Sequence, residues 1–304
     1  MASYNFKKDA KVYLVFDNLK FKIEINSDIS FSQTFEEKSS NVKTLHGPLD
    51  YFERAVINKA NPGNFNLSAP LNRGPNTSTL LDWLLSNPAN SLYAVDVYVD
   101  TGTEIFLLKK SVAESGIIQL VKNQIPTMSI SGTLSRLTRF GASGTAIPGV
   151  LQTLDTVPNS SIILPNYMLV QLNGVELKNI TSVTIELKNE VQWIENNTIH
   201  SSLYVTGASD TTYPEAFVVS SKTLSGTVQQ YVTDENRANL QTWSTTASFR
   251  VRVGNSLNTY SFDCNLPSVV FTNRLDTQDA FLQFYDLRVN ATPANLRNLI
   301  TTYL

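Results

Sequence analysis

Side chains suited to catalysis are few in this chain, and their spacing matches no catalytic or metal-binding pattern. There are two histidines, His46 and His200, and one cysteine, Cys264. None belongs to a His-x-x-His or Cys-x-x-Cys motif, which argues against a zinc site. The sequence also lacks a Gly-x-Ser-x-Gly turn, a phosphate-binding loop and a dinucleotide-binding glycine motif. We therefore expect neither an enzyme nor a bound metal or cofactor.

The remaining reactive or aromatic side chains favour structural roles. Glu24 and Glu186 lie in segments that alternate apolar and polar residues, where carboxylates face solvent and are not paired for acid–base chemistry. Cys264 also lies in such a segment, and we predict that it is a small core residue. Trp83 and Trp243 are predicted core anchors, with a carbohydrate ligand on exposed tryptophans as the alternative.

The composition suits a protein with large uncharged surfaces. Apolar residues make up 42% of the 304 residues, which is enough for hydrophobic cores. Charged residues make up only 16%, against about 25% in typical soluble proteins. The net charge of −2 gives no basic footprint for nucleic-acid binding. Met1–Lys11 is polar and no segment is apolar enough to span a membrane, so we expect cytoplasmic synthesis and no membrane partner.

Segments of similar pattern recur in the two halves of the chain, which indicates a duplicated domain. Each half has two alternating strands, a short helix that includes a tryptophan, a strand pair and a last strand. The proposed pairs are Phe21–Asn26 with Val183–Lys188, Phe65–Ala69 with Leu224–Val232, Thr79–Leu85 with Ala238–Trp243, Val95–Val99 with Phe249–Val253, and Met128–Leu137 with Phe281–Val289.

Turn residues divide the rest of the chain. Asp17-Asn18, Asp100-Thr101-Gly102 and Gly254-Asn255-Ser256 predict hairpins. Apolar spacing predicts a helix at Leu49–Lys59, and Thr292-Pro293 opens another that runs to about Tyr303.

The predicted fold is mainly β, with two tandem antiparallel β-sandwich or barrel-wall domains and a short flanking helix in each. The first domain covers residues 1–140. A linker rich in Gly, Pro and Ser covers 141–165, and the second domain with its C-terminal helix covers 166–304.

This order of elements resembles that of the tail tube proteins of tailed bacteriophages, in the form that carries two tandem tube domains. The resemblance covers Lys11–Val289. An opening strand pair precedes a polar excursion, Thr34–Pro48 in one half and Asn189–Pro214 in the other. A strand, a short helix, a hairpin and a final strand follow.

The resemblance implies rings whose sheets join around a channel that conducts DNA without binding it specifically. Trimeric rings with pseudo-sixfold symmetry are implied, with a hexamer as the alternative, stacked into the tail tube of the virion. The implied partners are other copies, tape-measure and baseplate proteins, and a sheath protein if the tail is contractile. A baseplate or tube-initiator protein of the same fold is an alternative function.

A two-domain carbohydrate- or receptor-binding β-sandwich is the alternative from another class. It would need clustered exposed aromatic residues on loops. Trp193, Tyr204 and Tyr213 come closest, but they are spread through one excursion. The duplication favours assembly over ligand binding.

Two sets of residues are candidate positions in such an assembly. A DNA channel needs a neutral or repulsive wall, so we predict that Glu24 and Glu186 line it, with an ordinary outer surface as the alternative. Aligning the halves also places Asp96 opposite Arg250, and Tyr98 opposite Arg252. We predict that contacts between copies use this difference to fix domain order, and two separately solvated faces are the alternative.

Overall fold

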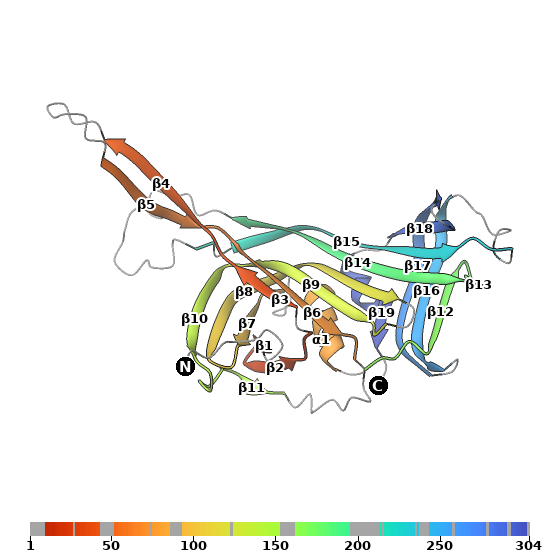
Figure 1. The fold of residues 1–304 in the computed structure, drawn as a ribbon, viewed down its shortest axis with the longest axis horizontal. Coiled ribbons are helices and arrows are strands. Elements are labelled where there is room, and N and C mark those ends of the chain that lie inside the picture. Colours follow the sequence, from red (N-terminus) through yellow and green to blue (C-terminus); the bar gives the residue numbers. More distant parts are fainter. Residues whose placement is uncertain are drawn as a thin grey trace.

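The structure, a computed structural model, describes residues 10–26, 28–42, 52–72, 75–85, 93–121, 124–152, 162–194, 213–214, 216–234, 236, 243–256, 259–277, 280–290 and 293–302. It confirms the predicted mainly β class, and its described part contains a single α-helix. Figure 1 shows the arrangement of the strands.

The first half forms two sheets that share the long strand β8. Its elements are β1 (Lys11–Phe16), β2 (Leu19–Ile23), β3 (Ile29–Ser32), β4 (Phe35–Val42), β5 (Phe52–Ala60), β6 (Gly63–Pro70), α1 (Pro75–Leu85), β7 (Val95–Asp100), β8 (Glu104–Val121), β9 (Thr127–Leu134), β10 (Arg136–Ala142) and β11 (Val150–Leu151). One sheet has the order β11-β2-β1-β7-β8-β10. The other has the order β3-β6-β9-β8.

Turn residues account for both hairpins predicted in this half, and the structure confirms them. Asp17 and Asn18 have φ angles of 47° and 60°, as required by the two-residue turns that match strand twist. At the β7–β8 turn Gly102 has a φ of 91°. Its N–H donates to Asp100 Oδ1 at 2.9 Å, the local bond that makes aspartate a turn residue.

The second half repeats this order of pairing. Its elements are β12 (Tyr167–Leu172), β13 (Val175–Glu176), β14 (Ile180–Ile194), β15 (Ala216–Tyr231), β16 (Trp243–Ser256), β17 (Thr259–Thr277), β18 (Phe281–Val289), the 3-10 helix η5 (Pro293–Leu299) and β19 (Ile300–Thr302). β12 pairs with β13 and β16, as β1 pairs with β2 and β7. The order β14-β15-β18-β17 matches β3-β6-β9-β8, and β19 lies on β17 as β10 lies on β8. The predicted hairpin between β16 and β17 is confirmed.

One pairing of segments between the halves is wrong. Val183–Lys188 lies in β14, whose counterpart in this order is β3 and not β2, the strand that contains Phe21–Ile23. Glu24 and Glu186 therefore do not occupy matching positions. β2 and β14 both alternate apolar and polar residues, and alternation alone does not identify which of two neighbouring strands is repeated.

Buried apolar side chains of both halves belong to one core. Trp83 is 1% exposed and stacks on Phe65, with 5.4 Å between ring centroids, which confirms it as an anchor. The helix predicted at Thr79–Leu85 is α1, which begins earlier, at Pro75. Cys264 is buried as predicted, and burial raises the pKa of its thiol.

Trp243 is not a core anchor, so that prediction is wrong. It is the first residue of β16 and is 63% exposed. It pairs with the exposed Thr272, while the neighbouring Phe271 is the side chain that enters the core. The rest of the helix predicted at Ala238–Trp243 lies outside the described residues.

The described parts of the predicted irregular excursion, Thr34–Pro48, and of the predicted helix, Leu49–Lys59, pair as two strands of a long hairpin instead, and residues 43–51 lie outside the described residues. β4 and β5 pair antiparallel from Phe35↔Ala60 to Val42↔Phe52. The hairpin extends away from the sheets at the upper left of Figure 1. Aromatic and β-branched residues suit a paired strand, and β4 supplies the partner that the sequence does not reveal.

Part of the segment predicted as a linker lies on the first half. Val150–Leu151 pairs in parallel with β2, and the buried Ile163 donates its N–H to Leu71 O. At the other end, the helix predicted from Thr292 to Tyr303 is a 3-10 helix followed by a strand. Thr292 and Tyr303 lie outside the described residues.

Candidate assembly surfaces

The two halves are joined through their backbones. β8 and β14 pair antiparallel without a register shift, from Ser115↔Lys188 to Val121↔Ser182. A single sheet therefore runs in the order β3-β6-β9-β8-β14-β15-β18-β17 across both halves. Gly116 allows this joint to lie close to α1, because a Cβ there would collide with Leu84.

Asn189 of β14 bridges the joint. Its buried side-chain Nδ2 donates to Leu84 O at 3.0 Å and to Ala113 O at 2.8 Å. The last carbonyls of a helix have no intrahelical partner, so the second half supplies one for α1. Sequence reasoning missed this residue. The signal was a polar side chain on the core face of β14, two residues after Leu187.

Arg297 of η5 makes a second link to α1. Its guanidinium donates to Ser78 Oγ at 2.9 Å and to Ile300 O at 2.7 Å, and it forms an ion pair with Asp82. Charge-assisted bonds of this kind are the stronger ones. The end of the second half is thereby fixed to the helix of the first.

The aromatic residues considered for carbohydrate binding contact the chain itself. Trp193 Nε1 donates to Thr133 Oγ1 at 2.8 Å, and its ring lies 5.2 Å from that of Phe217. Tyr213 lies edge-on to Phe35 at 6.3 Å and below the Arg136 guanidinium at 4.7 Å. Tyr204 lies outside the described residues.

A lysine and a tyrosine continue this cluster at the joint. Tyr93 stacks on Phe217 at 5.6 Å, and burial raises the pKa of its phenol to about 12. Lys222 Nζ lies 4.9 Å from the centroid of the Tyr93 ring, and burial lowers the pKa of this ammonium to about 8. Burial of both groups indicates that β14 and β15 are closely packed on the first half.

The shared sheet has one face turned away from the core, and that face is rich in uncharged polar side chains. Each strand alternates buried apolar residues with more exposed polar ones. Ser182 Oγ donates to Gln229 Oε1 at 3.1 Å, and Thr227 Oγ1 donates to Asp286 Oδ1 at 3.1 Å. Members from both halves are Ser30, Asn64, Asn66, Ser129, Ser131, Gln119, Thr184, Ser225, Thr227 and Gln229.

The charged side chains of this face have both signs and lie mostly in the second half. In the first half, Glu114 of β8 accepts a bond from Thr133 Oγ1 at 2.6 Å; in the second, Arg288 of β18 is exposed. Glu186 and Lys188 are exposed on β14, and Arg274 lies 3.8 Å from Asp286. Glu24 follows β2 and lies in none of these strands. The structure therefore places Glu186 on the polar face and Glu24 elsewhere, which leaves a role for Glu24 as a prediction only.

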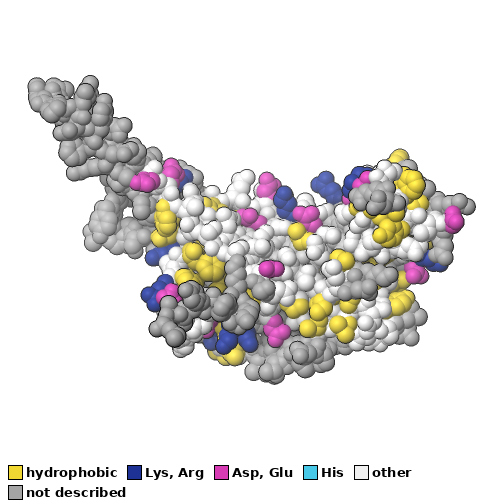
Figure 2. Space-filling view, in the orientation of Figure 1, with side chains coloured by type: hydrophobic (Ala, Val, Ile, Leu, Met, Phe, Trp, Pro, Cys, Tyr) yellow, Lys and Arg dark blue, Asp and Glu magenta, His cyan; other side chains and the backbone are white. Residues whose placement is uncertain are grey.

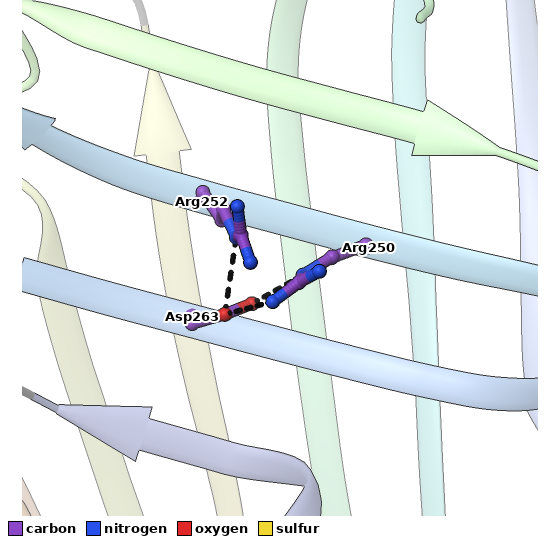
Figure 3. Close-up of polar contacts among 3 residues, drawn as sticks. All are labelled: Arg250, Arg252 and Asp263. Carbon is purple, nitrogen blue, oxygen red and sulfur yellow. Dashed lines mark hydrogen bonds and ion pairs between the residues drawn. The ribbon is translucent and has the colours of Figure 1, made fainter. Parts of the chain in front are cut away.

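Arg250 and Arg252 bind a carboxylate of their own hairpin (Figure 3). Arg250 Nε and Nη2 lie 3.0 and 2.6 Å from the two oxygens of Asp263, and Arg252 Nε lies 3.1 Å from Oδ2. Arg252 also lies 4.6 Å from the centroid of the Tyr260 ring. Burial raises the pKa of Asp263, and Arg252 opposes that rise.

Asp96 and Tyr98 also have local contacts. Asp96 Oδ1 accepts a bond from Lys110 N at 2.9 Å, where the backbone has a φ of 49°. Tyr98 is buried and lies edge-on to Phe140 at 5.0 Å. The structure therefore brings Arg250 and Arg252 together, but within one chain it does not bring them to Asp96 or Tyr98.

The described part of the chain shows no metal-binding group. It contains no cluster of three or more His, Cys, Asp or Glu side chains placed to hold a metal ion. His46 and His200 lie outside the described residues. No described helix is both long and apolar enough to cross a membrane.

These features define a mainly β protein of the structural class. Its distinctive surfaces are the joint between β8 and β14 and the polar face of the shared sheet. The chain belongs to the Bacteriophage Baseplate Tube Protein Family, whose model matches residues 2–297. The resemblance to phage tail-type proteins is thereby confirmed, and the chain is a structural component of a phage tail.

The other comparisons add little to this family assignment. A solved structure, the cryo-EM structure of the anti-feeding prophage (AFP) baseplate with sixfold symmetry, is 16% identical. That match covers 46% of this chain and 98% of the other, with a TM-score of 0.37, which is too low to carry an argument. No curated protein matches the chain.

Proposed function

We propose that this chain is a duplicated tube domain whose copies form a ring at the baseplate end of a phage tail tube. The supporting observation is the shared sheet, in which one pairing order occurs twice and is continuous through the β8–β14 joint. In a ring, the same joint would recur between chains. Three chains then supply six domains, and six chains are the alternative.

The strand edges needed for that contact lie at the two ends of the shared sheet. β3 pairs only with β6 among the described strands. At the other end, β16 pairs with β17 only as far as Thr272, so Arg274–Thr277 has β18 as its one described neighbour. Exposed strand edges are templates for pairing with another chain.

The polar face of the shared sheet is the proposed channel wall. Passing DNA should meet few fixed cations, because lysine and arginine bind phosphate by releasing counterions. Ser, Thr, Asn and Gln predominate on this face, and Glu186 lies on it. DNA would then move through the channel without specific binding. We assign contacts with the next ring, a tape-measure protein or a sheath to the β4–β5 hairpin, because it extends away from the sheets.

Cryo-electron microscopy of the purified chain at high concentration tests this function. We expect rings of three chains with pseudo-sixfold symmetry and with Ser129 and Thr184 facing the axis. Protein that stays monomeric at every concentration, even with its baseplate neighbours present, would contradict the proposal. Rings with this face outside would remove the channel wall but not the ring.

Salt dependence tests the role proposed for Asp96, Tyr98, Arg250 and Arg252. The arginines outnumber their one carboxylate partner, so their face keeps positive charge for a neighbouring copy. Exposed ion pairs contribute only about 0–1 kcal/mol each. These charges would therefore affect the order of the domains around the ring more than the strength of association between chains. We expect more misordered rings when salt rises from about 0.1 to about 1 M, which shortens the screening length to about 3 Å. The same fraction of misordered rings at both salt concentrations would refute this role.

A further inference from the structure

β8 and β17 hold the same place in the pairing order, but a different strand lies along the edge of each. β9 and β10 run along one edge of β8. On the other edge β7 pairs as far as Ser111, and β14 pairs from Ser115 to Val121. In the second half, β16 is the counterpart of β7. It is longer than β7 and pairs with β17 as far as Thr272. β16 has 14 residues and β7 has 6.

The extra part of β16 is Trp243–Ala247, which we call the guard segment. Ser244 pairs with Phe271 and Trp243 with Thr272, on the edge that β14 occupies in the first half. Two chains cannot use one strand edge at once. The guard segment therefore covers the first part of the β17 edge that the repeated joint would need, and Arg274–Thr277 lies beyond it.

The guard segment is weakly attached. Its register shifts between Ser244 and Ala247 and again between Ala247 and Phe249, whereas the β8–β14 pairing has no shift. Such bulges leave residues without a ladder partner. Thr246 N–H donates to Ser244 Oγ at 3.3 Å, a local bond within the segment. A competing strand with regular pairing can therefore replace it.

Apolar side chains lie exposed around this end of β17, on the guard segment, on β17 itself and on β18. Leu275, Phe281 and Trp243 are 57%, 59% and 63% exposed. Near the end of β8, by contrast, Leu120 is 1% exposed. Figure 2 shows hydrophobic side chains gathered over the ends of β15, β17 and β18, at the upper right. Exposed groups of this kind mark a contact surface.

We propose that the guard segment keeps the first part of this β17 edge, as far as Thr272, closed until β3 of a second copy of this chain displaces it. The partner follows from the pairing order, because β3 stands where β14 stands and β14 is the strand that joins β8. The inference rests on the proposed ring function. It adds that the free chain resists assembly, so ring formation needs high concentration or a template.

A disulfide lock and a release variant test the guard segment. Trp243→Cys with Thr272→Cys joins a direct cross-strand pair, whose Cα separation of about 4.5–5.5 Å permits a disulfide. Ser256→Cys with Thr259→Cys is the matched control at the hairpin end of the same two strands. The native Cys264 is buried and does not compete. Ser244→Pro removes a ladder donor from the guard segment and should release it.

Ring formation is measured by sedimentation and negative-stain microscopy over a concentration series, with circular dichroism to verify folding. We expect no rings from the oxidised lock and normal assembly after reduction or in the oxidised control. Ser244→Pro should form rings at about tenfold lower concentration, the shift that corresponds to loss of about one hydrogen bond.

The outcomes separate this inference from the proposed ring. Rings from the oxidised lock at the same concentration as the reduced form would overturn the guard segment and leave the ring intact. If wild type, reduced lock and Ser244→Pro all stay monomeric at every concentration, even with their baseplate neighbours present, both proposals fail.

Discussion

Trp83→Ala is expected to lower the free energy of unfolding by about 3–5 kcal/mol, the usual cost of truncating a buried aromatic side chain. The indole is 1% exposed and stacks on Phe65, so its removal leaves a cavity between α1 and β6. Trp243→Ala, by contrast, should change stability by no more than about 0.5 kcal/mol, because that side chain is largely exposed. Urea unfolding of both variants measures the difference.

Trp83→Phe is the control for cavity size. The Trp83 Nε1 group has no hydrogen-bond partner in the described part of the structure, so phenylalanine gives up volume but no polar contact. Its loss of stability should be clearly smaller than that of Trp83→Ala. Similar losses for Trp83→Ala and Trp243→Ala would contradict the assigned burial of the two side chains.

Asn189→Ala should lower the free energy of unfolding by about 2–6 kcal/mol, because a buried carbonyl left without its partner costs about 1–3 kcal/mol and this change removes the donor to two. The carbonyls belong to Leu84 and Ala113, so the expected loss falls on the packing of α1 against the joint. Hydrogen exchange should show faster opening of the last turn of α1. Thermal or urea unfolding gives the magnitude.

Asn66→Ala is the matched control, since Asn66 is an exposed asparagine in strand β6 of the same sheet. Its effect should stay within about 0.5 kcal/mol. An Asn189→Ala protein as stable as Asn66→Ala would show that Asn189 does not hold the two halves together.

Features set by neighbouring residues could be predicted from the sequence. The turns at Asp17-Asn18 and Gly102 need left-handed backbone, and the residue types there provide it. The apolar residues of α1 are spaced for one buried face, and Trp83 lies on it. These predictions succeeded because local geometry decides them.

Features set by distant partners could not be predicted. β5 carries residues that suit either a helix or a strand, and only pairing with β4 makes it a strand. Trp243 was predicted to be a core residue because it follows the strand Leu224–Val232. In the structure the core position beside it is filled by Phe271. Pairing between segments far apart in sequence decides both cases.

For the candidate assembly surfaces, the sequence could predict some residue positions but not the side chains that they contact. Aligning the halves identified the positions of Arg250 and Arg252, but it could not show that Asp263 lies between them across the hairpin. Glu24 was chosen because its segment alternates like that of Glu186, and strand order separates the two. Asn189 and Arg297 contact α1 through individual side-chain bonds, for which no sequence motif exists.

The contact between Arg297 and Asp82 has a consequence for synthesis of the protein. The two residues are 215 positions apart, so the helix made early by the ribosome receives this partner only after Arg297 has emerged. Domains generally fold from the N-terminus during translation. The first half must therefore wait for η5 before its helix is fixed, and a chain that ends before Arg297 lacks this clasp. Only chains translated past Arg297 then present a fully fixed first half to an assembling tail.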